Sequence, residues 1–572
     1  SSDTEDWNAQ LGIRGTTSET VKDRLTVGPP IVNVTGYNAI TPFSNPFIRI
    51  HNNWQYAYQL VQTRGNHSMR YGAEVRTTKI DLDDWNTPNG NFTFTGRYSG
   101  NAIADMLLGY PSQTQRLVGP GVSNMRSWQA AAFAQDEWRV TPAFSLNYGL
   151  RYEYQAPSWE VNDAWGAFVP SLNKPVQAGT EGLPRTIREF SKANFGPRVG
   201  MVYDLSGNGR RTIRAGYGLY FASLTNATLL ANFQNAPISL RQTFVANATT
   251  PNITMSDPFP AALAGTSVQA QGFEPVWNLG RTHRWSADIQ QALGSNGAIT
   301  LGYVGSISRF LPRAYNINQP VLGTGTAQSR RPYPLYGDIT WNIADGEANY
   351  HSLQTKVERR LSGGLSAIVA YTWQKALNNV NDGGAGDTGN QNAYARDEFG
   401  LAGHNRAHRF TASVIYDSPF SNVLAKDWQF AGVATVSSGQ PFTPVLTTDR
   451  AGVGAFTGQR PDAICNGNLP ADERSADRWF DTRCYPLTTA GTFGNVGRNT
   501  LTAPGLQTVD TVLSRYIPLG GARTMQLRWE VFNLLNHTNF LIPNRNADSP
   551  DFGKIFQALP GRQMQLAVKF VF

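Results

Sequence analysis

The 572-residue sequence predicts an all-β protein, a transmembrane antiparallel up-and-down β-barrel of about fifteen strands. Three observations lead to this prediction. Segments in which apolar and polar residues alternate recur along the whole chain, which is the period-two signature of strands. The connections between these segments are alternately short turns and long loops. The chain also contains no apolar run of about 20 residues, which a membrane-spanning helix would need.

The composition supports this fold class. The chain has 55 Gly, 29 Phe, 22 Tyr and 14 Trp, only 16% charged residues and a mean hydropathy of −0.35. Abundant aromatic residues and low charge density argue against disorder. The net charge of +8 comes mostly from Arg, because only nine of the 49 basic residues are Lys, and it is spread without blocks of like charge. This pattern argues against a nucleic-acid partner.

The last ten residues, 563–572, alternate strictly, and ten residues is about the length of a tilted strand that crosses a bilayer. One face of this segment carries five apolar side chains: Met564, Leu566, Val568, Phe570 and Phe572. A chain that ends on an aromatic residue in this way resembles bacterial outer-membrane barrels, whose terminal strand is the signal that the barrel-assembly machinery reads. The alternative is an ordinary edge strand of a soluble β domain.

Seven hairpins with short connections precede this strand. In the first, Asn53–Thr63 and His67–Thr77 are joined by the tight-turn sequence at 64–66. The second strand of this hairpin places Arg and Glu opposite an apolar face, as the wall between lipid and a wet lumen requires. The other six hairpins pair Trp128–Val140 with Phe144–Tyr154, Phe195–Leu205 with Arg211–Phe221, Arg284–Leu293 with Ala298–Ser306, His351–Leu361 with Leu365–Leu377, His408–Tyr416 with Trp428–Val436, and Thr508–Ile517 with Thr524–Phe532.

Long connections separate these hairpins. The segment Leu82–Arg126 contains a short predicted helix at Ala102–Leu108. The longest loop, Gly439–Gln507, contains both cysteines, Cys465 and Cys484, for which one disulfide in an oxidising compartment is the natural interpretation. Short turns on one side and long loops on the other are typical of outer-membrane barrels, in which the short turns are periplasmic and the long loops extracellular.

The order in which short turns and long loops alternate along the chain predicts the domain organisation. Both the first segment, Asn53–Thr63, and the terminal strand run inward, whereas single-chain bacterial barrels have an even number of strands. We therefore expect at least one more strand upstream. Residues 1–52 are interpreted as the remnant of an extracellular loop, and residues 53–572 as the C-terminal portion of the barrel. The chain starts with Ser and has no signal peptide, so we expect a processed chain or a fragment.

Several ordered motifs resemble the C-terminal barrel of the Oar-like TonB-dependent receptors of acidobacteria and related soil bacteria. They include FAQDEWRVTPAFSLNYGLRYE, NYHSLQTKVERRLSGGLSAIVAYTWQKA, LRWEVFNLLNHTNF and GRQMQLAVKFVF. The resemblance covers some 520 residues and implies a 22-stranded barrel with a plug in its lumen and an N-terminal periplasmic domain. This chain has no plug, N-terminal domain or TonB box, so coupling to the TonB complex is implied by the resemblance alone.

Five charged residues on the predicted inner faces are candidates to line the lumen, with docking of a plug as their alternative role: Arg151, Glu153, Arg214, Arg528 and Glu530. Six Trp residues near strand ends suit the aromatic girdles of a barrel, although they would also suit the core of a soluble sandwich: Trp54, Trp138, Trp285, Trp373, Trp428 and Trp529.

The sequence predicts no enzyme, because it has no phosphate-binding loop ending in Lys-Ser/Thr, no HExxH and no GxSxG. No cofactor is expected. His404 and His408 are four residues apart, which on a strand is more than about 10 Å and too far for one metal. A weak alternative is calcium in the loop at 378–406, whose acids do not have EF-hand spacing: Asp382, Asp387, Asp397 and Glu398.

These observations predict an integral protein of the bacterial outer membrane that takes up a large solute, such as an oligosaccharide, a peptide or a metal chelate, through a plugged barrel. The expected partners are that solute, outer-membrane lipid and lipopolysaccharide, the barrel-assembly machinery, and the TonB complex through the missing N-terminal part. The alternative is a structural or adhesive protein whose loops bind matrix or neighbouring cells. A passive porin is the third hypothesis.

Overall fold

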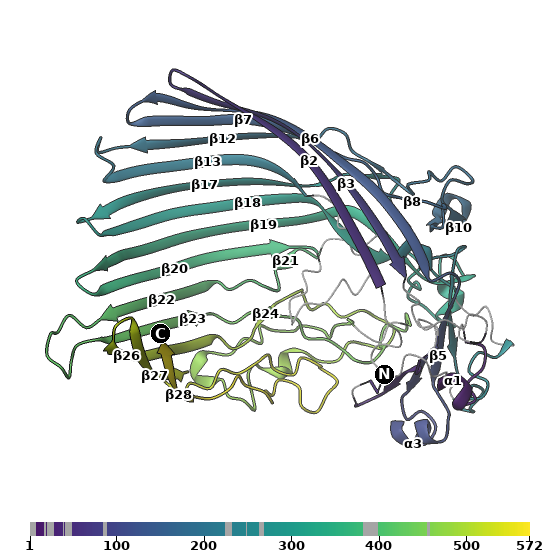
Figure 1. The fold of residues 1–572 in the computed structure, drawn as a ribbon. Coiled ribbons are helices and arrows are strands. Elements are labelled where there is room, and N and C mark those ends of the chain that lie inside the picture. Colours follow the sequence, from purple (N-terminus) through teal and green to yellow (C-terminus); the bar gives the residue numbers. More distant parts are fainter. Residues whose placement is uncertain are drawn as a thin grey trace.

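The computed structural model describes residues 7–16, 19, 28–37, 39–40, 48–83, 89–222, 231–247, 249–261, 268–380, 398–454 and 458–572. Within these ranges the chain forms one large, strongly curved antiparallel meander (Figure 1). Its fifteen strands, in the order of pairing, are β2 (Ile48–Arg64), β3 (His67–Asp83), β6 (Val122–Thr141), β7 (Phe144–Gln155), β12 (Phe195–Asp204), β13 (Arg211–Ala222), β17 (Gly280–Leu293), β18 (Gly297–Asn316), β19 (Tyr336–Ser362), β20 (Leu365–Asn378), β22 (His408–Asp417), β23 (Trp428–Ser437), β26 (Leu506–Gly520), β27 (Arg523–Phe532) and β28 (Gln563–Val571).

Shorter elements lie in the long loops. Seven of them extend the sheet to 22 strands: β1 (Ile31–Val34), β4 (Asn91–Phe94), β5 (Gln113–Val118), β8 (Trp159–Glu160), β14 (Leu240–Val245), β15 (Val268–Phe273) and β21 (Gly400–Leu401). Three separate pairs are β9 (Gly166–Val169) with β10 (Lys174–Gln177), β11 (Glu189–Phe190) with β16 (Val276–Trp277), and β24 (Pro441–Phe442) with β25 (Leu501–Thr502). These 22 strands are therefore not the 22 membrane-spanning strands that the resemblance implies.

The helices are short. The α-helices are α1 (Trp7–Gln10) and α3 (Ala102–Leu107), and the latter confirms the helix predicted at 102–108. Single 3₁₀ turns occur at Pro170–Leu172, Ala231–Gln234, Gln328–Arg330, Ala471–Glu473 and Thr482–Cys484. No helix within the described ranges has the length and apolar character needed to cross a membrane.

The strands agree with the predicted hairpins at their short turns and are longer on the loop side. β2 begins at Ile48 rather than Asn53, β18 ends at Asn316 rather than Ser306, and β19 begins at Tyr336 rather than His351. The predicted boundaries of β18 and β19 were wrong because these strands continue to pair with each other beyond a bulge at residues 308–311, and that of β2 was wrong because β2 pairs with β3 as far as Ile48 and Asp83. The alternation is broken at such a bulge, so the sequence pattern ends before the strand does.

The tight turns depend on residues that tolerate a left-handed backbone. Gly364 lies in the turn between β19 and β20 with φ of 78°. A Cβ at this position would lie 2.2 Å from the carbonyl oxygen of Asp417 on the neighbouring strand β22, so only glycine fits.

The two margins of the meander are β2 and β28. Among the pairings of the described residues, β2 pairs only with β3 and β28 only with β27. Side chains on both strands are correspondingly exposed, and Leu566 is 82% accessible. The assignment of residues 1–52 to a loop remnant stays a prediction. Their described parts lie on the loop side, where Ile13 and Val34 pack with Phe92 and Phe244.

Candidate functional site on the inner wall

The two faces of the meander differ in chemistry. Residues directly opposite one another on antiparallel strands point to the same face, so the register assigns every side chain. One face carries most of the exposed large apolar side chains of these strands, for example Tyr148, Tyr217 and Leu566. The other face carries Arg, Glu, Gln and Gly, and we call it the inner wall.

All five candidate lumen-lining residues lie on the inner wall. Arg151 and Glu153 form an ion pair on β7, Arg214 lies 3.5 Å from Asp288 across β13 and β17, and Arg528 and Glu530 form an ion pair on β27. The structure does not bring these five residues together, since β7, β13 and β27 are separated by other strands. Whether they only line the wall or also dock a plug stays a prediction.

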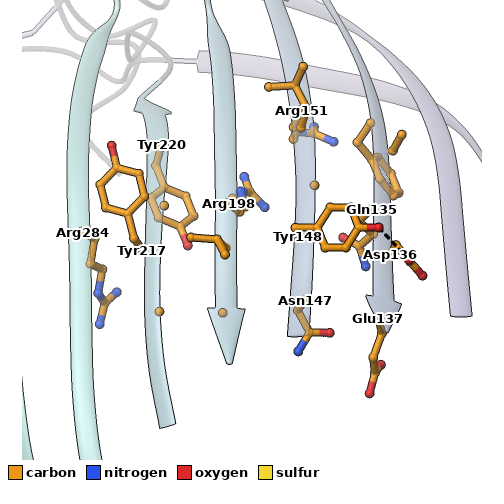
Figure 2. A pocket seen from close by; sticks show the side chains of 18 of the residues that line it. Gln135, Asp136, Glu137, Asn147, Tyr148, Arg151, Arg198, Tyr217, Tyr220 and Arg284 are labelled. Carbon is orange, nitrogen blue, oxygen red and sulfur yellow. Dashed lines mark hydrogen bonds between the residues drawn. The ribbon is translucent and has the colours of Figure 1, made fainter. Parts of the chain in front are cut away.

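A cavity lies on the inner wall across β3, β6, β7, β12, β13 and β17. It has a volume of about 600 Å³, and four arginines line it: Arg70, Arg151, Arg198 and Arg284. Figure 2 shows the last three of them. Three of them share one cross-strand row, which runs Arg70, Gln135, Gly149, Arg198, Gly218 and Arg284. Glycine at two positions of this row leaves the wall hollow between the long side chains.

Aromatic rings fill the floor of this hollow. A Cβ on Gly218 would lie 2.8 Å from the ring of Tyr220, so Tyr220 lies flat over Gly218, with the Arg198 guanidinium 4.7 Å from the ring centre. Figure 2 shows Tyr220 beside Arg198 on neighbouring strands. The same arrangement recurs at Gly72, which is covered by the ring of Phe133. A flat ring over glycine gives a sugar, a peptide or an aromatic chelator a surface on which to stack.

The hollow is electropositive. Arg151 is paired with Glu74 and Glu153, but no carboxylate of the described residues forms an ion pair with Arg70, Arg198 or Arg284. Of the acidic residues that line the cavity, Glu137 is on the inner wall, whereas Asp136 belongs to the outer row. Guanidinium groups bind carboxylate and phosphate through paired hydrogen bonds, so this wall suits a solute that bears anionic groups.

A second cavity of about 390 Å³ continues the inner wall toward the short turns. It shares Ser286 with the first cavity, and Arg214, Asp288, Gln354 and Lys356 line it. The two cavities together form a polar path along the wall of the sheet.

On the loop side, segments of the long loops fold onto the inner wall. We call this cluster the mouth lobe; its large apolar side chains are Trp165, Phe190, Phe233, Phe273 and Trp277. They pack against Ile80, Leu82 and Met125, which lie on β3 and β6 on the same face as Arg70 and Gln135. The long loops therefore cover the loop-side end of the inner wall.

The mouth lobe also buries a cation. Arg188 is fully buried, and its guanidinium carbon lies 4.3 Å from the ring centre of Trp277 and 4.6 Å from that of Phe273. Burial lowers the pKa of Arg188 to about 9, and the nearby Glu274 partly opposes this shift. The ring faces replace the hydrogen bonds that all three guanidinium nitrogens lack among the described residues.

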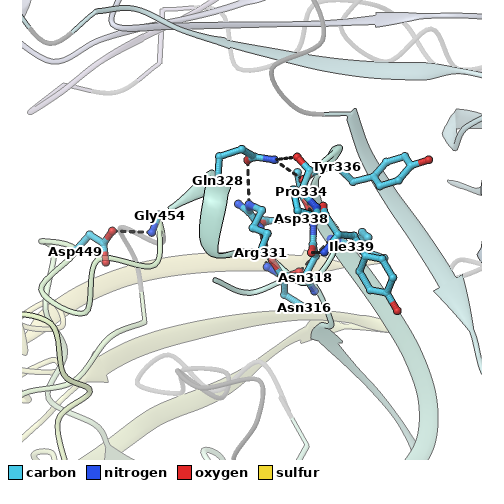
Figure 3. Close-up of polar contacts among 12 residues, drawn as sticks. Asn316, Asn318, Gln328, Arg331, Pro334, Tyr336, Asp338, Ile339, Asp449 and Gly454 are labelled. Atoms are coloured by element: carbon cyan, nitrogen blue, oxygen red, sulfur yellow. Dashed lines mark hydrogen bonds and ion pairs between the residues drawn. The ribbon is translucent and has the colours of Figure 1, made fainter. Parts of the chain in front are cut away.

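Other loops are tied to one another by side-chain amides and guanidinium groups. In the connection between β18 and β19, Asn318 Nδ2 donates to three backbone carbonyls at residues 333, 336 and 337 (Figure 3). Arg330 of this connection donates to the carbonyl of Gly452 in a second long loop. There, Asp449 accepts from the backbone N–H of Gly454 at 2.7 Å. Described segments of two long loops are thus hydrogen-bonded to each other.

The two cysteines, Cys465 and Cys484, form a disulfide in the loop at 439–507. Cys484 is buried in a cluster that we call the disulfide lobe, whose other members include Phe442, Phe480, Tyr485, Val496 and Leu501. Met564, Leu566, Val568 and Phe570 of the terminal strand point to the outer face, opposite the inner-wall residues Gln565, Ala567, Lys569 and Val571, and Phe572 follows the end of the strand. Their role as a barrel-assembly signal stays a prediction.

The calcium hypothesis for the loop at 378–406 stays a prediction. Asp382, Asp387 and Asp397 lie outside the described residues, and Glu398 is paired with buried Arg460 at 2.6 Å. His408 lies on β22, where its Nδ1 is 2.8 Å from the hydroxyl of Tyr371. The described part of the chain holds no group of three or more His, Cys, Asp or Glu suited to a metal ion.

Sequence reasoning did not single out Arg198, Tyr220 or Arg284. Alternation could assign each to the inner face of its strand. It could not bring them together, because their meeting depends on the register of β12, β13 and β17 across loops of very different length.

One solved structure shares this architecture. The outer membrane transporter YddB from Escherichia coli superposes with a TM-score of 0.52 at 12% identity, covering 94% of this chain and 57% of that one. The ferric enterobactin receptor PfeA from Pseudomonas aeruginosa superposes with a TM-score of 0.48 at 11% identity, covering 95% and 57%. The chain thus spans less than two thirds of the length of these structures.

No curated protein sequence matches the chain. The sequence model of the outer membrane β-barrel domain matches residues 1–565. With its antiparallel meander, apolar outer face and polar inner wall, the chain belongs to the outer membrane β-barrel family and is an integral protein of the outer membrane.

Proposed function

We propose that the protein is a TonB-dependent transporter of the Oar-like type, which takes up a large solute through a plugged barrel. The observation that carries this proposal is the electropositive, aromatic-floored hollow on the inner wall, next to a mouth covered by ordered loops. The fold shared with YddB, an outer membrane transporter, supports a transport role in general. The motifs quoted above support the Oar-like type.

The residues that line the hollow indicate which chemical groups the solute carries. Three arginines without carboxylate partners among the described residues favour anionic groups, and the ring of Tyr220 favours a flat or cyclic group. An acidic oligosaccharide, an acidic peptide or a carboxylate-bearing metal chelate has both features. Coupling to the TonB complex and assembly by the barrel-assembly machinery are proposed from the resemblance and from the terminal strand.

Uptake in cells tests this proposal. Cells that lack the gene are complemented with the wild type, with Arg198→Gln/Arg284→Gln, or with the control Lys426→Gln/Arg523→Gln, whose residues lie at the short turns. Labelled oligosaccharides, peptides and metal chelates are supplied. We expect one class to require the gene and TonB, and its uptake to fall at least tenfold in the Arg198/Arg284 variant alone. Uptake of every class without the gene would contradict a transport role.

The alternative function is adhesion, which the ordered loop surface favours. The disulfide lobe and the mouth lobe each have a packed apolar cluster, and on this proposal they form an extracellular surface that binds matrix or a neighbouring cell. If deletion of the gene abolished attachment of cells to matrix and left the uptake of all three solute classes unchanged, adhesion would be the function. Uptake that persists without TonB would instead indicate a passive porin.

A further inference from the structure

A short segment of the mouth lobe is held in place by very little sheet structure. Residues 185–191, which we call the strap, join a sheet only through β11, which pairs with β16 over two residues within the described ranges. The backbone N–H groups of Glu189 and Ser191 donate at 2.9 Å to the carbonyls of Pro275 and Trp277. A pairing this short can open while the long strands stay folded.

The middle of the strap buries a cation that has no hydrogen-bond partner. Three aromatic side chains enclose its guanidinium, with ring centres 4.3 to 5.5 Å from the guanidinium carbon of Arg188: Trp277, Phe273 and Phe190. None of the three nitrogens is hydrogen-bonded within the described residues. The carboxylate of the nearby Glu274 instead accepts from the backbone N–H of Ala344 at 2.8 Å. Ring faces replace only part of the hydration that a buried cation loses, so Arg188 gains when it meets an anion outside this ring cage.

The residue before Arg188 is also in an unfavourable state. Ile187 has a φ of 65°, in the left-handed region, where a β-branched residue is strained. Its side chain is buried in the apolar cluster of the mouth lobe, which holds the backbone in this conformation. The closed strap thus contains a strained residue and an unpaired buried cation at adjacent positions, and lifting its middle relieves both.

The two ends of the strap are anchored separately from its middle. At one end, Arg185 forms an ion pair with Asp163. At the other end, Asn194 Nδ2 donates to the carbonyl of Ser191 at 2.9 Å. The middle of the strap can therefore lift while both ends stay attached to the lobe.

The strap belongs to the part of the mouth lobe that covers the inner wall. Ile187 and Phe190 lie in one apolar cluster with Ile80 and Met125, from β3 and β6, and with Ala344 from β19. This cluster joins strands that are far apart in the meander, above the loop-side end of the inner wall. On the transport function proposed above, a solute from outside the cell meets this lobe before it reaches the hollow.

We propose, resting on that transport function, that Arg188 is a specificity-determining residue of the mouth, which leaves its ring cage to bind a carboxylate, sulfate or phosphate group of the incoming solute. The strap lifts with Arg188 and uncovers the loop-side end of the inner wall. The rings exclude an anion from the closed strap, so paired hydrogen bonds to the guanidinium form only in the lifted strap. Binding of an anion therefore shifts the equilibrium toward the lifted strap, and a neutral solute leaves it closed.

Hydrogen exchange of the strap tests the proposal. The protein, purified from the outer membrane in detergent, is measured by mass spectrometry with hexagalacturonate, hexaglutamate or neutral maltohexaose at equal millimolar concentration and equal ionic strength. A peptide that covers residues 185–193 reports on the N–H groups of Glu189 and Ser191 that donate to the β16 segment. A peptide that covers the paired strands β9 and β10 is the internal control.

Two variants are compared with the wild type. Arg188→Met fills the ring cage without a charge, and Arg523→Gln loses the same charge at a short turn, far along the strand from the mouth lobe. Heat-modified migration in gels verifies that each variant is folded.

We expect both acidic probes to raise the exchange rate of the strap at least fivefold in the wild type and in Arg523→Gln, and maltohexaose to leave it unchanged. Arg188→Met should exchange at least fivefold more slowly than the wild type without a probe and should not respond to any probe. A wild-type strap that responds to neither acidic probe would overturn the proposal. An equal acceleration of β9 and β10, or an undiminished response of Arg188→Met, would overturn it as well.

Arg188→Lys decides the question if Arg188→Met does not fold. Lysine keeps the charge but cannot form paired hydrogen bonds, so the response to the acidic probes should fall at least threefold, and a full response would overturn the proposal. The uptake assay separates this inference from the transport function. Uptake that does not require the gene contradicts transport, whereas gene-dependent uptake with an unresponsive strap overturns only the role of Arg188.

Discussion

The Asp136 carboxylate lies 2.6 Å from Nδ1 of His67, on the outer face of β6 and β3. The Tyr148 hydroxyl donates to the same carboxylate at 3.0 Å, and the ring of Trp138 stacks on His67 at 5.3 Å. An acidic group on the lipid-facing side of a barrel is costly unless it is paired. These neighbours explain how the outer wall tolerates Asp136.

This pair predicts a strongly non-additive mutational response. His67→Leu removes the shorter of the two side-chain hydrogen bonds to the Asp136 carboxylate, and we expect a loss of about 1–3 kcal/mol in the free energy of unfolding. The double variant His67→Leu/Asp136→Leu removes both polar groups from the lipid face and should be within about 1 kcal/mol of the wild type. Urea unfolding in phospholipid vesicles measures both values. A double variant as unstable as the sum of the single variants would contradict this account.

The packing of Tyr220 predicts a difference between two neighbouring glycines. A methyl group at Gly218 would press on the Tyr220 ring at 2.8 Å, whereas at Gly216 the nearest atom is the Val199 carbonyl oxygen at 3.6 Å. We expect Gly218→Ala to lower the free energy of unfolding by about 1–3 kcal/mol, as is typical of overpacking. Gly216→Ala, the matched control, should change it by less than about 0.5 kcal/mol. Equal effects of the two substitutions would mean that Tyr220 does not cover Gly218.

The membrane-spanning part of the fold could be predicted from the sequence because alternation and tight turns are local signals. The segments paired around residues 64–66, 206–209 and 362–364 all form the predicted hairpins. The loop-side strands could not be predicted in this way. β5 pairs with β4 nearby and with β14 more than a hundred residues later, and short apolar runs in loops do not reveal such partners.

The candidate site was predictable only in part, for the same reason. Arg151 and Arg214 could be assigned to an inner face from the pattern of their own strands. The hollow itself depends on cross-strand register, which places Gly218 between Arg198 and Arg284. A single sequence contains no signal for the stagger between strands that are joined by long loops.

The disulfide predicts a local rather than a global effect on stability. Cys465 and Cys484 close a loop with a sequence separation of 19, for which chain-entropy arguments give a stabilisation of about 3 kcal/mol. In the double variant Cys465→Ser/Cys484→Ser we expect faster proteolytic cleavage between residues 458 and 507, with heat-modified gel migration of the barrel unchanged. Cleavage at the wild-type rate would show that the packing of Phe480 and Tyr485 alone holds the disulfide lobe.

The same lobe contains a carboxylate that should make it sensitive to acid. Asp481 accepts from Arg483 Nε at 2.9 Å and from Nη2 at 2.7 Å, and this interaction lowers the pKa of Asp481 to about 2. The ordinary pKa of an Asp carboxyl is about 3.9. A carboxylate whose pKa is lower than this in the folded state stabilises the fold at pH values above about 3.9. This stabilisation is lost as the pH falls from about 4 to about 2.

We therefore expect pepsin to cleave the disulfide lobe faster at pH 2.5 than at pH 4.5, beyond the change in the activity of the enzyme on an unfolded reference peptide. Asp481→Asn carries no titrating group at this position. In this variant, most of the difference in cleavage rate between pH 2.5 and pH 4.5 should disappear. Arg483→Gln should return the Asp481 pKa toward its ordinary range, so that the transition moves to higher pH. If Asp481→Asn kept the full acid sensitivity, another carboxylate of the lobe would have to be its source.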